Sequence, residues 1–281
     1  MKDTLLMKAS TRFCVVAGVL ASFSVSAFAQ DPDDVPPVTD APDGQFSVVR
    51  GLQAPKGMVA ARVLLGFNLS KDAAGEPVSL APDLYYGVTD RVQIGLVHQG
   101  PMGWQGRPGL GICFTGEEHG CPEVYDNLGF DLMVGLAFEK VHMSLHSTLF
   151  INTFDPFATS LALGFAGKAH LSGNFAVYFD PKIAISLNER DLVDDALFIP
   201  LELQFQAAPR TTLKLLTGLA GGLTEFGDNY EIPLGLGIMQ NLSEHFDLGA
   251  RFSFDNLLGH EDANIGRADA RSLAVLLNIR S

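Results

Sequence analysis

The feature that most constrains the fold of this chain is a two-residue alternation that runs along most of its length. It is clearest in residues 127–139, NLGFDLMVGLAFE. The even positions from Leu128 to Phe138 are large and apolar, whereas odd positions such as Gly129 and Asp131 are small or polar. A period of two indicates a strand with two different faces, because a helix would need a period near 3.6. The chain therefore predicts an all-β fold.

Twelve segments share this alternation. We expect strands at 58–69, 79–88, 91–100, 127–139, 141–152, 157–168, 175–186, 197–206, 211–222, 231–240, 246–255 and 269–280. Tight links are expected at 89–90, 139–140, 169–173, 207–210 and 241–245, and longer polar links at 70–78, 101–126, 153–156, 187–195, 223–230 and 257–266. This succession predicts an up-and-down antiparallel sheet with its tight turns at one end.

The medium that contacts the large apolar face decides between two kinds of barrel. A soluble sandwich or barrel would bury that face and present a charged outer face, yet the minor face here is rich in Gly and Ala. Soluble strands average about five or six residues, whereas strands of about nine to eleven residues cross a bilayer at a tilt. We therefore expect a closed up-and-down antiparallel transmembrane β-barrel of about 12 strands, with its apolar face toward lipid and its minor face toward the lumen.

The expected lumen carries both signs of charge. Its candidate lining residues are Arg62, Asp83, Asp131, His142, His146, Lys168, Asp180, Lys182, Glu202, Lys214, Asp247 and Arg251. These residues could form a ladder of ion pairs in a closed structural barrel, or they could line a narrow passage. Twelve strands lie between the side-chain-filled eight-stranded barrels and the open sixteen-stranded porins, so both alternatives stay open.

The N-terminal part divides into two segments before the barrel, which we expect at 57–281. Residues 1–29 have the basic start, short apolar stretch and small-x-small ending of a cleaved secretory signal peptide, with cleavage between Ala29 and Gln30. Residues 30–56 form an acidic, Pro-rich lead segment that we expect in the periplasm. The formal net charge of −13 argues against nucleic acid as a partner.

Three tight links share one pattern of residues: VTDRV at 88–92, LSGNF at 171–175 and LSEHF at 242–246. With the signal peptide and the alternation, they make the chain resemble the porin-like outer-membrane β-barrel proteins of Gram-negative bacteria. The resemblance implies an outer-membrane location, contact with outer-membrane lipid and the barrel assembly machinery. One departure is the end of the chain, LLNIRS, where Ile279 stands in place of an aromatic residue.

The function expected for such a barrel is a narrow passive pore for small solutes, without a cofactor or a metal. The alternatives are a closed structural barrel, and binding or adhesion through the loops. A weaker alternative is lipid hydrolysis, because His142, Ser144 and Asn152 lie on one strand face and resemble the outer-membrane phospholipase. In that family Ser is the nucleophile, His the base and Asn orients the His. The alternation places His142 and Ser144 inside the barrel, away from lipid, so we do not expect an enzyme.

The longest link, 101–126, contains the only Trp of the chain, Trp104, and two cysteines. In a secreted chain Cys113 and Cys121 predict a disulfide, worth roughly 2.5 kcal/mol by the chain-entropy model. The link could fold inward as a constriction, stand outward as a recognition surface, or simply resist proteolysis. Its Gly and Pro residues permit each of these.

Overall fold

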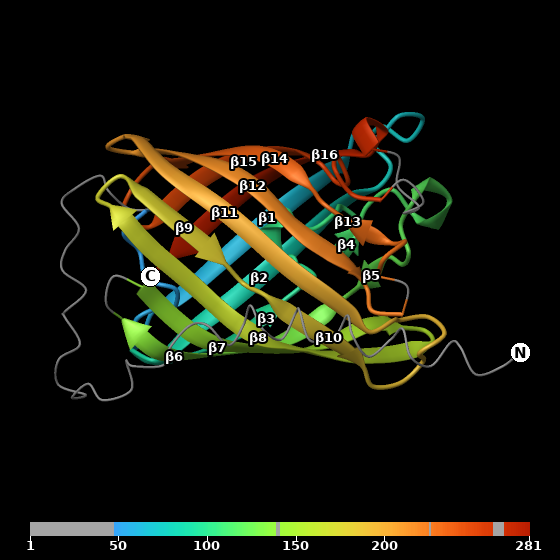
Figure 1. Ribbon diagram of the computed structural model, residues 1–281, viewed down its shortest axis with the longest axis horizontal. Helices are drawn as coiled ribbons and strands as arrows, with labels where there is room; N and C mark the ends of the chain where they lie inside the picture. Colours follow the sequence, from blue (N-terminus) through green and yellow to red (C-terminus); the bar gives the residue numbers. More distant parts are fainter. Residues whose placement is uncertain (1–47, 139–140, 225, 261–266) are drawn as a thin grey trace, which may run out of the picture. The chain divides into compact units, whose positions relative to one another are not determined.

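The wall of the protein is a closed antiparallel β-barrel. The computed structural model describes residues 48–138, 141–224, 226–260 and 267–281. The expected signal peptide, its cleavage point at Ala29 and Gln30, and residues 30–47 of the lead segment lie outside the described residues. Figure 1 shows the wall strands side by side, each tilted against the long direction of the barrel.

Twelve wall strands follow one another around the barrel. They are β1 (Val59–Asn68), β2 (Val78–Thr89), β3 (Val92–Val97), β6 (Leu128–Phe138), β7 (Val141–Phe154), β8 (Phe157–Ser172), β9 (Phe175–Phe179) with β10 (Lys182–Ser186), β11 (Ala196–Ala208), β12 (Thr211–Gly222), β14 (Leu234–Asn241), β15 (Phe246–Phe254) and β16 (Arg271–Arg280). β9 and β10 are two halves of one wall strand, since both pair with β8 and β11. β1 pairs with both β2 and β16, which closes the ring. The predicted fold is confirmed.

Several short elements lie at one end of this wall. β4 (Gly111–Cys113) and β5 (Tyr125–Asp126) form a small hairpin beside β2, and β13 (Tyr230–Glu231) pairs with β12. Single 3-10 turns lie at Gly103–Gln105, Glu117–His119 and Arg267–Asp269. No helix among the described residues is long and apolar enough to span a membrane.

The two faces of the wall are inverted relative to those of a soluble protein. Large apolar side chains such as Phe130 and Leu236 are 51% and 67% exposed on the outside. Charged side chains such as Glu202 and Arg251 are 1% exposed on the inside. In water an exposed apolar belt of this extent would be strongly unfavourable, whereas lipid solvates it. The predicted assignment of the apolar face to lipid therefore holds.

The shared pattern of the tight links has a physical reason. At the β2–β3 link, the Thr89 hydroxyl accepts hydrogen bonds from the backbone N–H groups of Arg91 and Val92, at 3.1 and 3.0 Å. Ser172 and Ser243 accept in the same way from the second residue after each of them. The side chain thus satisfies amides that a tight reversal leaves without a ladder partner. We call this end, where the C-terminus also lies (Figure 1), the tight-turn end, and the opposite end the loop end.

Two local predictions are wrong. The link 153–156 was expected to be long, but β7 runs to Phe154 and β8 begins at Phe157, so only two residues connect them. Phe138 was expected to face lipid. A β-bulge between Gly135 and Ala137 reverses the alternation, so Phe138 instead pairs with His142 on the lumen side, with ring centroids 6.1 Å apart.

Candidate functional site

The interior of the barrel carries a network of paired charges. His146, on β7, lies between two carboxylates: its Nε2 is 2.8 Å from Asp131, and its Nδ1 is 2.9 Å from Asp180. Because each ring nitrogen faces an acceptor, this geometry suits the imidazolium form, which donates from both nitrogens. Asp180 also pairs with Lys182 at 2.7 Å and accepts from the Tyr178 hydroxyl at 3.1 Å. The network joins β6, β7 and the β9–β10 wall strand from the inside, across the intervening β8.

A second interior group lies on the following strands. Lys214, on β12, is 2.7 Å from Glu202, on β11, and Gln204 donates to the same carboxylate. Asp83, on β2, is held differently, since it accepts from Gln99 Nε2 at 2.6 Å, from the backbone amide of His98 at 2.8 Å and from the Tyr85 hydroxyl. Buried carboxylates are stable only when they are paired or hydrogen-bonded in this way.

The last part of the lead segment enters the lumen at the tight-turn end. We call residues 48–56 the strap. Arg50 forms a two-pronged ion pair with Asp247 on β15, at 2.6 and 3.0 Å, and Gln53 donates to Ser144 Oγ on β7 at 2.7 Å. β15 and β7 are six wall strands apart in the ring of twelve, so the strap reaches from one wall to the opposite one. The sequence prediction treated this segment as a lead into the barrel and missed its place inside.

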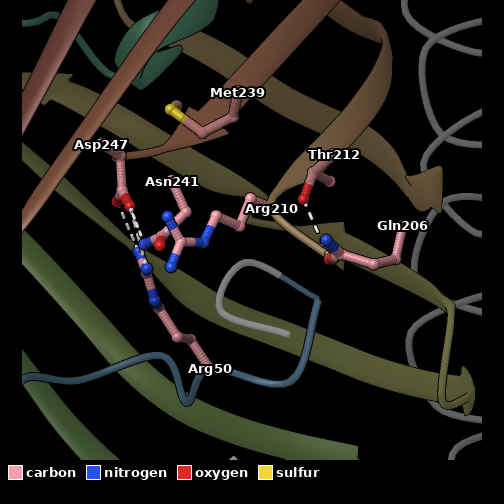
Figure 2. Close-up of a pocket in the computed structure, with 7 residues that line it drawn as sticks. All are labelled: Arg50, Gln206, Arg210, Thr212, Met239, Asn241 and Asp247. Atoms are coloured by element: carbon pink, nitrogen blue, oxygen red, sulfur yellow. Dashed lines mark hydrogen bonds and ion pairs between the residues drawn. The ribbon is translucent and has the colours of Figure 1, made fainter. Parts of the chain in front are cut away.

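The wall is shaped to receive the strap. A Cβ atom on Gly87 would lie 2.0 Å from the Pro55 carbonyl oxygen and 2.5 Å from that of Ala54, so only glycine fits there. The amide of Ala54 donates to Gln93 Oε1 at 2.8 Å. Figure 2 shows Arg50 reaching from the strap to Asp247, with Arg210 and Asn241 beside them.

The first part of the longest link enters the lumen from the loop end. We call residues 98–110 the inward loop. Trp104 is 8% exposed, and its ring lies 4.4 Å from Lys214 Nζ and 5.9 Å from the Arg251 guanidinium. Gly237 lies against this ring, because a Cβ there would be 3.2 Å from it. The sequence left open whether the longest link, 101–126, folds inward or stands outward. Over the residues of the inward loop, the structure shows the inward constriction.

Among the described residues, the strap and the inward loop help to shield the central lining from water. Ser144, Ala162, Ala166 and Ala176 are 0% exposed, although they face the lumen. Trp104 packs in an interior apolar cluster with Leu216, Met239 and four further residues, Leu64, Ala81, Ala274 and Leu276. A cavity of only about 10 Å³ lies between the inward loop and the wall at Leu64, Ser79 and Ala81. The described conformation is therefore closed.

The predicted lining residues all belong to the interior face. Asp83, Asp131, His146, Lys168, Asp180, Lys182, Glu202, Asp247 and Arg251 are buried, and Arg62, His142 and Lys214 are partly buried. The structure joins six of these twelve residues into the two groups above: Asp131, His146, Asp180, Lys182, Glu202 and Lys214. Arg62 instead lies over the Tyr85 ring, at 5.8 Å.

The residues weighed as a hydrolase do not come together. Ser144 receives its hydrogen bond from the strap residue Gln53, His142 contacts the rings of Phe138 and His170, and Asn152 bonds Ser160. Among the described contacts no hydrogen bond joins His142 to Ser144. The pair therefore lacks the nucleophile–base bond that such catalysis uses.

Three further interior residues were missed from the sequence: Arg50, Trp104 and Arg280. Arg280 pairs with Asp247 at 2.7 Å from the last wall strand. Its even position on 269–280 would have placed it on the lumen face with Asn278. Arg50 and Trp104 stand outside any alternating segment, so no periodic signal marks them.

The predicted disulfide between Cys113 and Cys121 is present, with the two Cα atoms 5.9 Å apart. Both cysteines are buried in the small hairpin at the loop end, while Phe114 and Val124 nearby are 58% and 63% exposed. The disulfide therefore staples the part of the longest link that stays outside the lumen.

No protein-family model matches the chain, and no curated protein matches its sequence. Solved structures do. The KdgM porin in complex with disordered oligogalacturonate aligns at 6% identity and a TM-score of 0.52, over 79% of this chain and 98% of its own. The NanC porin aligns at 6% and 0.51, over 79% and 98%. The COG4313 outer membrane channel from Pseudomonas putida F1 aligns at 13% and 0.51, over 90% and 100%.

The chain has the fold of an outer-membrane porin. At these identities the likeness concerns the fold alone, and the exposed apolar belt supplies the independent physical reason for a membrane location. Together they identify a transmembrane barrel of the bacterial outer membrane, as predicted.

Proposed function

We propose that the protein is a narrow passive channel for small solutes, which in the described conformation is closed by the strap and the inward loop. The observation that carries this proposal is the source of the material that fills the lumen. A closed structural barrel would fill its lumen with the side chains of its own wall. Here the wall does turn some large side chains inward, but part of the space beside its inward glycines and alanines is occupied by two segments that enter from opposite ends.

The attachment of these segments supports a removable closure. The strap bonds the interior wall through Arg50, Gln53 and Ala54, and the inward loop bonds it through a few polar contacts such as Gln105 Nε2 to the Leu201 carbonyl, at 3.3 Å. Neither segment is a strand of the wall, so the β-ladder that holds the barrel together does not depend on them. Their withdrawal would uncover the charged and hydroxyl-bearing lining that a hydrated solute needs.

The solved structures with this fold agree with a channel, since two bear the name porin and one the name outer membrane channel. His142 and Ser144 are not part of the proposal as a catalytic pair.

The test is a planar-bilayer recording of the purified mature protein and of the double variant Arg50→Ala, Gln53→Ala. We expect stepwise currents from both, with the variant open for a larger fraction of the time. A matched control is Lys71→Gln, an exposed loop residue, which should behave as the parent does. Absence of steps from parent and double variant at all voltages, with both folded by circular dichroism, would contradict the channel.

A further inference from the structure

Arg251 is an interior cation with a weak set of partners among the described residues. It is on β15 and 1% exposed, and one of its nitrogens, Nη2, donates to the backbone carbonyl of Gly106 at 2.9 Å. Its Nε and Nη1 have no hydrogen-bond partner. The nearby carboxylate Asp255 accepts from the hydroxyls of Ser253 and Ser272 instead. A buried guanidinium with two free donor atoms is energetically costly, and an oxyanion satisfies it best.

The other interior carboxylates are paired with other cations. Asp180 is taken by Lys182, and Glu202 by Lys214, each at 2.7 Å. Asp247 is shared between Arg50 and Arg280. Asp255 is near enough to attract Arg251 electrostatically, but among the described contacts it leaves the Nε and Nη1 donors of the guanidinium without a hydrogen bond.

The inward loop covers this charge with neutral groups. The Trp104 ring faces Lys214 and Arg251, and the Gly106 carbonyl takes a single guanidinium proton. A ring face and one carbonyl are weaker partners for two cations than an anion is. The loop therefore occupies a place in which an anion would bind more strongly.

The loop is rich in glycine. Gly100, Gly103, Gly106 and Gly109 recur at every third position through it. Gly103 has a φ of +57° and Gly109 one of +114°, and the value at Gly109 suits glycine alone. A cavity of about 10 Å³ borders Gly103, Gly106 and Arg107. An anion therefore needs the place that Trp104 now fills.

We propose that Arg251, with Lys214 beside it, forms an internal site for a small oxyanion, a carboxylate or a phosphate, and that the anion binds by displacing Trp104. This inference deepens the proposed function and rests on it, because it assigns anionic solutes to the channel. Arg251 supplies the planar fork that matches an oxyanion, and Lys214 adds a point charge while it keeps its bond to Glu202.

The single tryptophan makes the displacement directly measurable. Detergent-solubilised mature protein is titrated with sodium phosphate, and in a parallel series with sodium acetate, at constant ionic strength kept by sodium chloride. We expect a saturable red shift of the Trp104 emission with at least one of the two anions, because the indole leaves its buried place. The two series distinguish a phosphate site from a carboxylate site.

Arg251→Gln should raise the half-saturating anion concentration by about tenfold or more, since the charged fork is lost. Arg251→Lys keeps the charge without the fork, so its half-saturating concentration should fall between those of the parent and Arg251→Gln. The control Lys71→Gln should titrate as the parent does. The proposal is overturned by a parent that shows no saturable shift with either anion, or by Arg251→Gln and Arg251→Lys proteins, folded by circular dichroism, that titrate at the parent's concentration.

This readout does not depend on current. A saturable shift in a protein that never conducts would remove the channel and keep the anion site. Conductance without any shift would do the reverse.

Discussion

The lumen is closed twice, and the two closures use different chemistry. At the tight-turn end the strap is held by a bidentate ion pair, Arg50 with Asp247, and by hydrogen bonds to polar side chains. At the loop end the inward loop is held mainly by Trp104, which packs in an apolar cluster and faces two cations. The first closure depends on charge, whereas the second adds an aromatic ring to polar contacts such as the ion pair of Arg107 with Glu231.

The difference teaches how each closure should respond. An ion pair with one partly exposed partner, such as Arg50, weakens as salt screens it, whereas apolar burial of an indole does not. Among the described contacts, the Arg50–Asp247 pair is the main charged attachment of the strap, while the inward loop spreads its attachments over Trp104, the ion pair of Arg107 with Glu231 and several hydrogen bonds. Loss of the Arg50–Asp247 pair should therefore release the strap in one step, whereas loss of any single contact should loosen the inward loop only in part.

The largest effect is expected from Asp247→Asn, which removes the partner of two arginines at once. Breaking a buried ion pair from one side costs about 3–5 kcal/mol, because the remaining charge stays buried. We expect a lower unfolding midpoint in guanidinium chloride, followed by circular dichroism, together with a larger open fraction in bilayers. Asp90→Asn, at an exposed carboxylate that accepts from the Lys56 amide, serves as the control and should change little. An unchanged open fraction in Asp247→Asn would show that charge does not hold the strap.

Trp104→Ala comes next and tests the aromatic closure. Loss of the buried indole removes about 3 kcal/mol of packing, and Trp104→Phe should lose less because it keeps a ring. We expect a higher single-channel conductance in the Ala variant than in the parent. The ratio of the two conductances should be the same at low and at high salt. A salt-dependent effect would indicate that this end, too, is closed by charge, and the contrast between the ends would then fail.

Gly87→Ala tests the fit of the strap without touching any charge. The added Cβ would meet the Pro55 carbonyl at 2.0 Å, so the strap must shift at a cost of about 1–3 kcal/mol. We expect a moderate rise in open fraction. Gly173→Ala, in a tight turn with open space around it, is the matched control. Equal behaviour of the two variants would contradict a tight seat for the strap at this glycine.

The smallest effect on the current is expected from Cys113→Ser. The disulfide closes the hairpin outside the lumen, so its loss should leave conductance unchanged. The hairpin itself should become easier to cleave by added protease, because its ends are no longer joined. A clear change of conductance would mean that the hairpin also positions the inward loop.

The strands of the wall and their two faces could be predicted from the sequence, because the face on which a strand residue lies is a local, periodic property. The alternation from Leu128 to Leu136 follows from the pleat alone, and so does the interior position of Asp131. The prediction from alternation failed at Phe138, because a bulge inserts one residue there and the periodic pattern does not predict a bulge.

The contents of the lumen were not readable, for a different reason. The strap residues VVRGLQAPK have no periodicity, and their partners Ser144 and Asp247 lie far along the chain. The inward loop, GPMGWQGRPG, suits an inward or an outward path equally. Only contacts across the closed ring, such as Trp104 with Lys214, decide between them.

Asp247 has one further consequence, for the seam at which the barrel closes. It binds Arg280 of the final strand and Arg50 of the segment that precedes the first strand, so both ends of the barrel wall meet at one carboxylate. Arg280 lies on the strand next to β15, whereas the strap reaches Asp247 from the far side of the β1–β16 pairing. A single carboxylate therefore ties the strap across the seam between the first and last strands.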